Sequence, residues 1–178
     1  MSDPVLLITG SLGSGKTTVL GEITDILTEI RVPHAIVDQD ALSQFFPRPA
    51  GDPFGSDMMF ENLSAIWPNF HAAGADRLVL AGILQKRDTL ERYRSVLGVP
   101  GITVCRLTAS VETMQARLAV REPGRALDWH LNRSVELDAI LEQAAVGDFS
   151  VRNDGRPIGE VAEEVLQKAG WPHRAVRS

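Results

Sequence analysis

One short segment near the N-terminus constrains the fold more than any other part of the chain. Residues 10–17 read Gly-Ser-Leu-Gly-Ser-Gly-Lys-Thr and match the pattern G-x-x-x-x-G-K-[S/T]. The unbroken apolar run 5–8 comes directly before it, and residues 16–30 carry apolar side chains at helical spacing. An unbroken apolar run is typical of a parallel strand that is covered on both faces. The segment therefore predicts a buried strand, a glycine-rich turn and a helix in direct succession.

That succession forms a phosphate-binding loop, or P-loop. The glycines allow backbone N–H groups to turn inward around phosphate oxygens, and the helix N-terminus adds its positive dipole end. We expect Lys16 to bridge the β and γ phosphates of ATP or a close nucleotide, and the Thr17 hydroxyl to bind Mg²⁺. A glycine-rich turn with a solvated lysine is the alternative, but the pattern arises by chance in under ~1% of chains this long. The predicted nucleotide-binding residues of the loop are Gly10, Leu12, Gly13, Ser14, Gly15, Lys16, Thr17 and Thr18.

The rest of the chain alternates apolar strand patterns with helical patterns, which predicts an α/β fold with a parallel sheet and helices on both faces, in three layers. No repeat or linker divides the chain, so residues 1–178 are expected to form one domain. The expected strands are 5–8, 35–37, 78–81, 102–107 and 149–151. The expected helices are 16–30, 57–73, 87–97, 110–121, 130–145 and 158–169, with a loop at 47–55.

Composition narrows the class of protein. The apolar content of 44% is ordinary for a globular protein, and the net charge of −5 argues against a nucleic-acid partner. The single Cys105 excludes an internal disulfide. The N-terminal apolar run is too short for a signal peptide or a membrane span. We therefore expect a cytoplasmic protein without membrane association, either a monomer or a homodimer.

Four features occur together in this chain: the N-terminal P-loop, the size, the Asp38-Gln39-Asp40 sequence after the second strand, and an arginine-rich segment at 117–125. In these features the chain resembles the small P-loop kinases. This group includes shikimate, gluconate and adenylylsulfate kinases and the chloramphenicol phosphotransferase type. The resemblance implies a five-stranded parallel sheet in the order 2-3-1-4-5. It also implies Mg·ATP-dependent transfer of the γ-phosphoryl group to a hydroxyl of a small molecule. An acceptor-binding region is then expected at 41–73 and a lid at 121–133.

The two carboxylates that follow the second strand are candidates for catalysis, because ligands sit at the carboxyl ends of strands in open α/β sheets. By resemblance, Asp38 corresponds to the catalytic base or the Mg²⁺-side acid, and Asp40 to the acid that binds the acceptor. In the alternative interpretation, Asp38 only ends the strand and Asp40 caps a helix that begins at Ala41. The third strand, 78–82, contains no acid, which disfavours a motor or transport ATPase.

Arginines late in the chain are candidates for binding the nucleotide, since the planar guanidinium matches phosphate oxygens. The resemblance implies that Arg117 packs on the adenine and that Arg121 and Arg125 reach the transferring phosphoryl group. It also places the turn that holds Asn153 and Arg156 against the adenine. The alternatives are a solvated helix face for the first three and an ordinary tight turn for the last two.

The acceptor side is less defined by sequence. Aromatic and Met side chains between residues 41 and 73 could line a pocket or belong to the core. Arg48 and the segment Gln85-Lys86-Arg87 could bind an anionic acceptor or lie at a solvated surface. A nucleoside or nucleotide kinase, an antibiotic phosphotransferase and a nucleotide-binding regulator without an acceptor therefore remain as alternatives.

Overall fold

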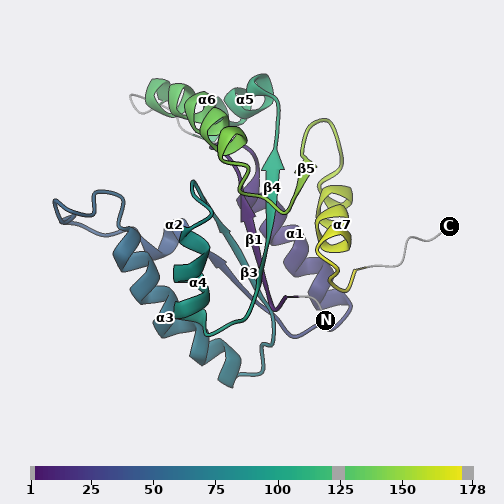
Figure 1. The fold of residues 1–178 in the computed structure, drawn as a ribbon. Coiled ribbons are helices and arrows are strands. Elements are labelled where there is room, and N and C mark those ends of the chain that lie inside the picture. Colours follow the sequence, from purple (N-terminus) through teal and green to yellow (C-terminus); the bar gives the residue numbers. More distant parts are fainter. Residues whose placement is uncertain (1–2, 122–126, 174–178) are drawn as a thin grey trace.

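The strands of the computed structural model, which describes residues 3–121 and 127–173, form one parallel sheet (Figure 1). Their order across the sheet is β2-β3-β1-β4-β5, and every neighbouring pair is parallel. The predicted α/β class and strand order are therefore confirmed. The strands are β1 (Val5–Thr9), β2 (Ala35–Asp38), β3 (Leu78–Gly82), β4 (Ile102–Thr108) and β5 (Phe149–Arg152).

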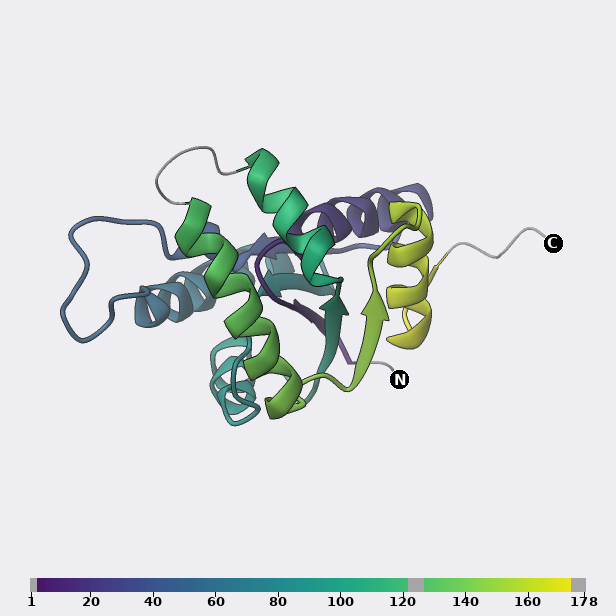
Figure 2. The same cartoon turned by 90° about the horizontal axis from the view of Figure 1, so that it is seen from above.

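Helices cover both faces of the sheet. The helices α1 and α7 pack together on one face, and α3 and α4 lie on the other (Figure 1). The helices α5 and α6 lie at the end of the sheet toward which the strands point, as the view from above also shows (Figure 2). The helices are α1 (Lys16–Glu29), α2 (Gln39–Leu42), α3 (Ser56–Ala72), α4 (Thr89–Leu97), α5 (Val111–Arg121), α6 (Leu127–Ala144) and α7 (Ile158–Lys168).

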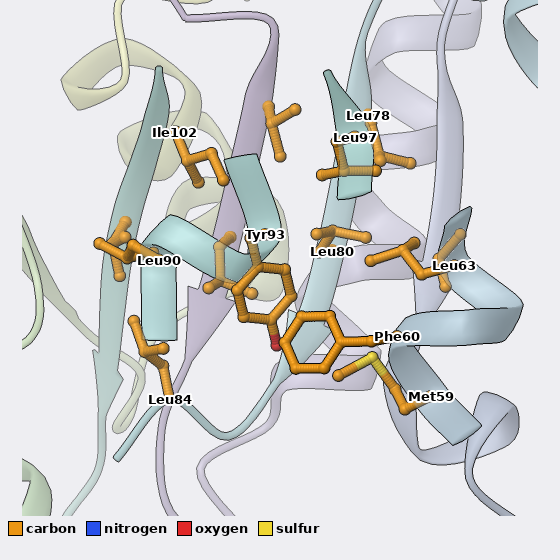
Figure 3. Close-up of a cluster of buried hydrophobic side chains, with 14 of the residues drawn as sticks. Met59, Phe60, Leu63, Leu78, Leu80, Leu84, Leu90, Tyr93, Leu97 and Ile102 are labelled. Atoms are coloured by element: carbon orange, nitrogen blue, oxygen red, sulfur yellow. The ribbon is translucent and has the colours of Figure 1, made fainter. Parts of the chain in front are cut away.

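Each face of the sheet has its own hydrophobic core, because side chains alternate along a strand. From β1, Val5 and Leu7 enter the core under α3 and α4, whereas Leu6 and Ile8 enter the core under α1 and α7. All four are fully buried. Figure 3 shows the first of these cores, in which side chains from α3 and α4 meet the strands. Burial on both faces explains why the strands read as unbroken apolar runs.

Two helices differ from the prediction. The short helix α2 begins at Gln39, directly after β2, and not at Ala41 as in the alternative interpretation, because the Asp38 carboxylate accepts a hydrogen bond from the Asp40 backbone N–H at 3.1 Å. The helix α6 begins at Leu127, three residues before the expected start, and Asp128 in its first turn suits the positive end of the helix dipole. By contrast, the predicted cap of α5 is confirmed, since the Thr113 N–H donates to Ser110 Oγ at 3.2 Å.

Among the described helices, none has the length and apolar character needed to cross a membrane.

Candidate active site

The P-loop connects β1 to α1 as predicted, at the carboxyl end of the sheet. Gly13 and Gly15 have φ angles of 79° and 95°, a conformation that residues with a side chain rarely adopt. A Cβ atom on Gly15 would also lie only 2.3 Å from Asn153 Nδ2. The loop therefore requires these glycines both for its backbone turns and for its close contact with the segment after β5.

Lys16 lies over this loop. Its Nζ donates hydrogen bonds to the carbonyl oxygens of Gly10 at 3.0 Å and Ser11 at 3.1 Å. The lysine charge is thereby held beside the first N–H groups of α1, which have no partner within the helix. Positive charge and inward-facing N–H groups in one place are the requirements of an anion site.

Thr17 and Asp38, the predicted metal pair, are brought together from α1 and β2. The Thr17 hydroxyl donates to Asp38 Oδ2 at 2.8 Å, while Asp38 Oδ1 caps α2. Two hard oxygen ligands beside a phosphate cradle fit Mg²⁺, which is bound in proteins by one or two such groups together with phosphates and waters. The alternative interpretation placed a helix cap at Asp40, but in the structure the cap is Asp38, whose other carboxylate oxygen still faces Thr17.

Arg117 and Asn153 form a wall beside the loop. Arg117 Nη1 donates to the carbonyl oxygens of Gly13 and Ser14, both at 3.3 Å, and its Nη2 donates to the Asn153 carbonyl at 2.9 Å. Asn153 is buried, and its Nδ2 donates to Ser14 O at 2.8 Å. The structure therefore brings both predicted residues to the P-loop, where they connect α5 and the β5 turn to it.

Asp154 holds that turn in place. Its carboxylate accepts hydrogen bonds from the Ser110 N–H at 2.9 and 3.0 Å and from Arg152 Nε at 2.7 Å. Partial burial of Asp154 acts to raise its pKa, but the hydrogen bonds from Ser110 and Arg152 outweigh it and lower the pKa below its ordinary value. The carboxylate consequently stays ionised at neutral pH and fixes the start of α5 against the β5 turn.

Two cavities meet beside the P-loop. The first, of about 300 Å³, lies over the loop and is also bordered by Arg117 and Leu118. The second, of about 530 Å³, lies between α2, α3, α4 and the segment after β3. Asp40 borders both of them. The lining of the second cavity is Gln39, Asp40, Ser43, Phe54, Ser56, Met59, Phe60, Ile83, Gln85, Lys86, Thr89, Arg92 and Tyr93.

A buried hydrogen bond forms part of the wall of the second cavity. The Tyr93 hydroxyl donates to Gln39 Oε1 at 2.8 Å, and burial raises the Tyr93 pKa, so that the phenol remains a neutral donor. The Tyr93 ring meets the Phe60 ring edge-on at 4.7 Å, next to Met59 (Figure 3). Gln39 Nε2 is buried and has no hydrogen-bond partner among the described residues. Gln39 reaches this position only because Gly82 at the end of β3 has no side chain.

We expect Gly82→Ala to destabilise the protein by about 1–3 kcal/mol, because the added Cβ would lie 2.0 Å from Gln39 Oε1 in a closely packed site. Gly21→Ala in α1 is the matched control. The space around Gly21 is open, so the same change there should stabilise the protein by about 0.5–1 kcal/mol. Urea unfolding of both variants measures the difference. Unchanged stability of Gly82→Ala would show that Gln39 is not confined by this contact.

Three predicted arginines lie outside both cavities. Arg156 donates to Glu164 of α7 at 2.6 Å, and Arg87 is ion-paired with Asp148 and donates to the Val146 carbonyl at 3.0 Å. Arg48 lies 5.3 Å from the centre of the Phe45 ring. Because long cationic side chains reach any nearby carboxylate or ring, their position in the sequence did not reveal these partners. The geometry does not bring Arg156 to the nucleotide side or Arg48 and Arg87 to the acceptor side.

Five residues of the predicted lid, 122–126, lie outside the described part of the chain, and residues 127–133 form the start of α6. Arg125 is one of these five residues. Arg121 is the last residue of α5, and its side chain is also outside the described part of the chain. At the end of the 121–133 range, Arg133 is paired with Glu136 at 2.8 Å. The catalytic roles of Arg121 and Arg125 therefore stay predictions.

Sequence reasoning missed the contribution of α4. Arg92 and Tyr93 border the second cavity, and Gln39, between the two predicted aspartates, is buried in its wall. The available signal was the position of α4 directly after β3, at the carboxyl edge where ligands bind. From the expected aromatic set, Phe54, Met59 and Phe60 line the cavity, and Phe60 also belongs to the core.

Comparison with known proteins identifies the fold. No model of a known protein family matches the chain, and no curated protein sequence matches it. Solved structures do. The tunicamycin resistance protein of Deinococcus radiodurans has a TM-score of 0.64 at 18% identity, over 97% of this chain and 98% of that chain. A gluconokinase from Sinorhizobium meliloti 1021 has a TM-score of 0.62 at 20% identity, over 96% and 94%.

The APS kinase of Mycobacterium tuberculosis, solved in complex with AMPPNP and APS, has a TM-score of 0.59 at 20% identity, over 93% and 96% of the two chains. Shikimate kinases are also among the structures that match over nearly the full length. The structural neighbours of this chain are thus small P-loop kinases, which confirms the resemblance at the level of the fold. Identities of this size leave the substrate and activity of the chain open.

Proposed function

We propose that the protein is a small-molecule kinase that transfers the γ-phosphoryl group of ATP to a hydroxyl of its acceptor. The observation that carries this proposal is the position of Asp40, which borders both the cavity over the P-loop and the larger cavity beside it. A phosphoryl group held on the loop and a hydroxyl held in the second cavity would therefore meet at this side chain. Phosphoryl transfer asks a protein mainly for such positioning and for charge stabilisation.

On the nucleotide side, Lys16 and the N–H groups at the start of α1 would bind the phosphate oxygens. Arg117, held by carbonyl groups of the loop and of the β5 turn, presents a guanidinium at the wall of the same cavity. Thr17 and Asp38 would hold Mg²⁺, which would supply positive charge to neutralise the phosphate oxygens.

On the acceptor side, Asp40 would accept a hydrogen bond from the attacking hydroxyl and orient it toward the P-loop. Asp38 would act nearer the nucleotide, because it already contacts Thr17. Asp38 is therefore the candidate general base, a role that requires a carboxylate within hydrogen-bond reach of the attacking hydroxyl.

The acceptor cavity also bears on the alternative functions. A nucleotide-binding regulator needs no acceptor cavity, whereas a cavity of about 530 Å³ falls in the range of small-molecule sites. An antibiotic phosphotransferase would be favoured by a largely apolar pocket, but this lining includes six uncharged polar residues and three charged ones. These observations support a polar metabolite as the acceptor.

The test is a screen of hydroxyl-bearing metabolites and nucleosides for acceptor-stimulated ADP release in the presence of Mg·ATP. The Lys16→Ala protein, purified in parallel, provides the background from contaminating ATPases. We expect at least one compound to stimulate ADP release by the wild type and to leave with one added phosphate, detected by mass spectrometry. Nucleotide hydrolysis that no compound alters would instead support the regulator.

We also expect ATP to bind more tightly than GTP, by about tenfold. The chain contains no Asn/Thr-Lys-x-Asp sequence, which reads guanine in other nucleotide-binding proteins. Adenine requires only stacking and backbone contacts, which Arg117 and the β5 turn beside the P-loop would provide. Competition of ATP and GTP for a fluorescent ATP analogue measures the ratio. A tenfold preference for GTP would contradict the adenine assignment.

A further inference from the structure

The acceptor cavity has an uneven distribution of charge. Among the described residues that line it, Asp40 is the one carboxylate, whereas Lys86 and Arg92 are both cationic. The chain as a whole has a net charge of −5, so this local excess of positive charge is opposite in sign to the rest of the molecule. An excess of positive charge in a cleft attracts anions and raises their local concentration.

Lys86 is available to a ligand. It lies in the connection between β3 and α4, and its side chain is exposed. Within residues 3–121 and 127–173, no hydrogen bond or ion pair of its side chain is present. A structural lysine would be expected to pair with a neighbouring carboxylate, as Lys168 does with Glu164 at 2.9 Å. Lys86 is therefore free to bind a group that enters the cavity.

Arg92 is positioned by stacking. Its guanidinium lies 4.2 Å from the centre of the Phe60 ring, and its Nη2 is 2.7 Å from Asp57 Oδ1. The Asp57 side chain is 66% exposed, and an exposed pair of this kind contributes little free energy. Asp57 can therefore yield to a better placed anion while Phe60 keeps the guanidinium plane in position. The planar fork of arginine suits a carboxylate or phosphate bound through two oxygens.

Gln39 adds a third donor to the same wall. It is 5% exposed, its Oε1 is occupied by the Tyr93 hydroxyl, and its Nε2 has no partner in the described part of the chain. A buried N–H without a partner costs free energy unless a ligand or water satisfies it. Three donor side chains and one carboxylate therefore favour a ligand rich in oxygen, with a negative group directed away from Asp40.

We propose that the acceptor is an anionic hydroxyl compound, a hydroxy acid or a hydroxylated phosphate ester, whose negative group is bound by Lys86 and Arg92 while its hydroxyl meets Asp40. This inference rests on the proposed kinase function, because it names the substrate class of the same site. Repulsion by Asp40 would orient the compound, since it disfavours the reverse placement of the anionic end.

The test measures binding without turnover. The protein is labelled with ¹³C-methyl Met for NMR, and Mg·AMPPNP saturates the P-loop. It is titrated with three anions: shikimate, D-gluconate and 3-phosphoglycerate. The uncharged counterparts are the methyl ester of shikimate and gluconamide. Met59 lines the cavity and reports binding, and Met114, which packs behind Gly13, is the internal reference. We expect at least one anion to shift Met59 and to bind about tenfold or more tightly than an uncharged compound of matching shape. The carboxylates and the phosphate ester together distinguish the two kinds of negative group.

Variants then assign the residues. Lys86→Met and Arg92→Met should each weaken the binding of that anion by about tenfold. The matched controls are Lys168→Met on α7 and Arg94→Met, two residues further along α4, where it pairs with Glu91 at 3.0 Å; neither should change the affinity. All four side chains are partly exposed, so the variants should remain folded.

Several results would overturn the proposal: no anion shifts Met59, the uncharged compounds bind equally well, or Lys86→Met and Arg92→Met bind like the wild type. Failure of the kinase function looks different. In that case anions would shift Met59 with the expected dependence on Lys86, but no charged or uncharged hydroxyl compound would be phosphorylated. Phosphorylation of an uncharged acceptor only would retain the kinase function and exclude the anionic acceptor.

Discussion

Lys16→Ala should reduce ATP turnover by about 10²–10³-fold, the range found when a positioned charge or donor at a transition state is removed. The effect should be large because Lys16 is held over the loop by the carbonyl groups of Gly10 and Ser11, beside the N–H groups that would bind the phosphates. Removing its charge takes one cation away from the transferring phosphoryl group, which the remaining groups of the site would not replace. Steady-state rates with the acceptor found in the screen measure the loss, and binding of a fluorescent ATP analogue measures the affinity.

Lys168→Ala is the control for this variant, because Lys168 lies on α7 and pairs with Glu164 away from the P-loop. Thermal unfolding of both variants separates a catalytic loss from an effect on the fold. Near-normal turnover in a folded Lys16→Ala protein would defeat the assignment of Lys16.

Asp38→Asn and Asp40→Asn should impair different steps. Asp38 contacts Thr17 and caps α2, so its neutral variant should lower kcat by about 10²-fold while ATP affinity is largely kept. Asp40 borders both cavities, and its neutral variant should mainly raise the acceptor KM, by about tenfold, because a charge-assisted hydrogen bond to the acceptor is weakened. Steady-state kinetics of both variants on the same acceptor provide the comparison.

The Asp38 variant needs a separate control because of its second role as a helix cap. Asn caps helices about as well as Asp, because its amide oxygen accepts the same backbone hydrogen bond, so urea unfolding should find Asp38→Asn within about 0.5 kcal/mol of the wild type. A loss of kcat in this folded variant would therefore come from the lost charge and not from a lost cap. Wild-type kcat and KM in both variants would mean that the pair has only structural roles. The kinase proposal would then lose its main support outside the P-loop.

The P-loop could be predicted from the sequence because its geometry depends on consecutive residues. Gly13 and Gly15 adopt the turns that only glycine adopts easily, and the strand before them and the helix after them were recognisable from apolar spacing. The order of the strands followed from resemblance to the small P-loop kinases and agrees with the structure. The proximity of Thr17 to Asp38 could also be expected, because both follow strands at the same edge of the sheet.

Asp40 shows where this local reasoning reached its limit. On an extended strand end, Asp38 and Asp40 would point the same way, but the chain turns into α2 at Gln39. Asp38 consequently faces Thr17, Gln39 is buried against Gly82, and Asp40 lies between the two cavities. The separation of roles was predicted, but the geometry behind it depends on the start of the one-turn helix α2 at Gln39, two residues before the position that the sequence suggested.

The sequence alone determined the α/β class and the phosphate-binding loop, since apolar periodicity and glycine geometry act over neighbouring residues. Only the tertiary structure decided which side chains line the second cavity, where we propose that the acceptor binds. That cavity combines segments around residues 39–43, 54–60 and 83–93, which are distant along the chain and meet through the packing of α3 and α4 on the sheet. It likewise decided the partners of Arg48, Arg87 and Arg156, because a long cationic side chain pairs with whichever carboxylate, carbonyl or ring the folded chain places within its reach.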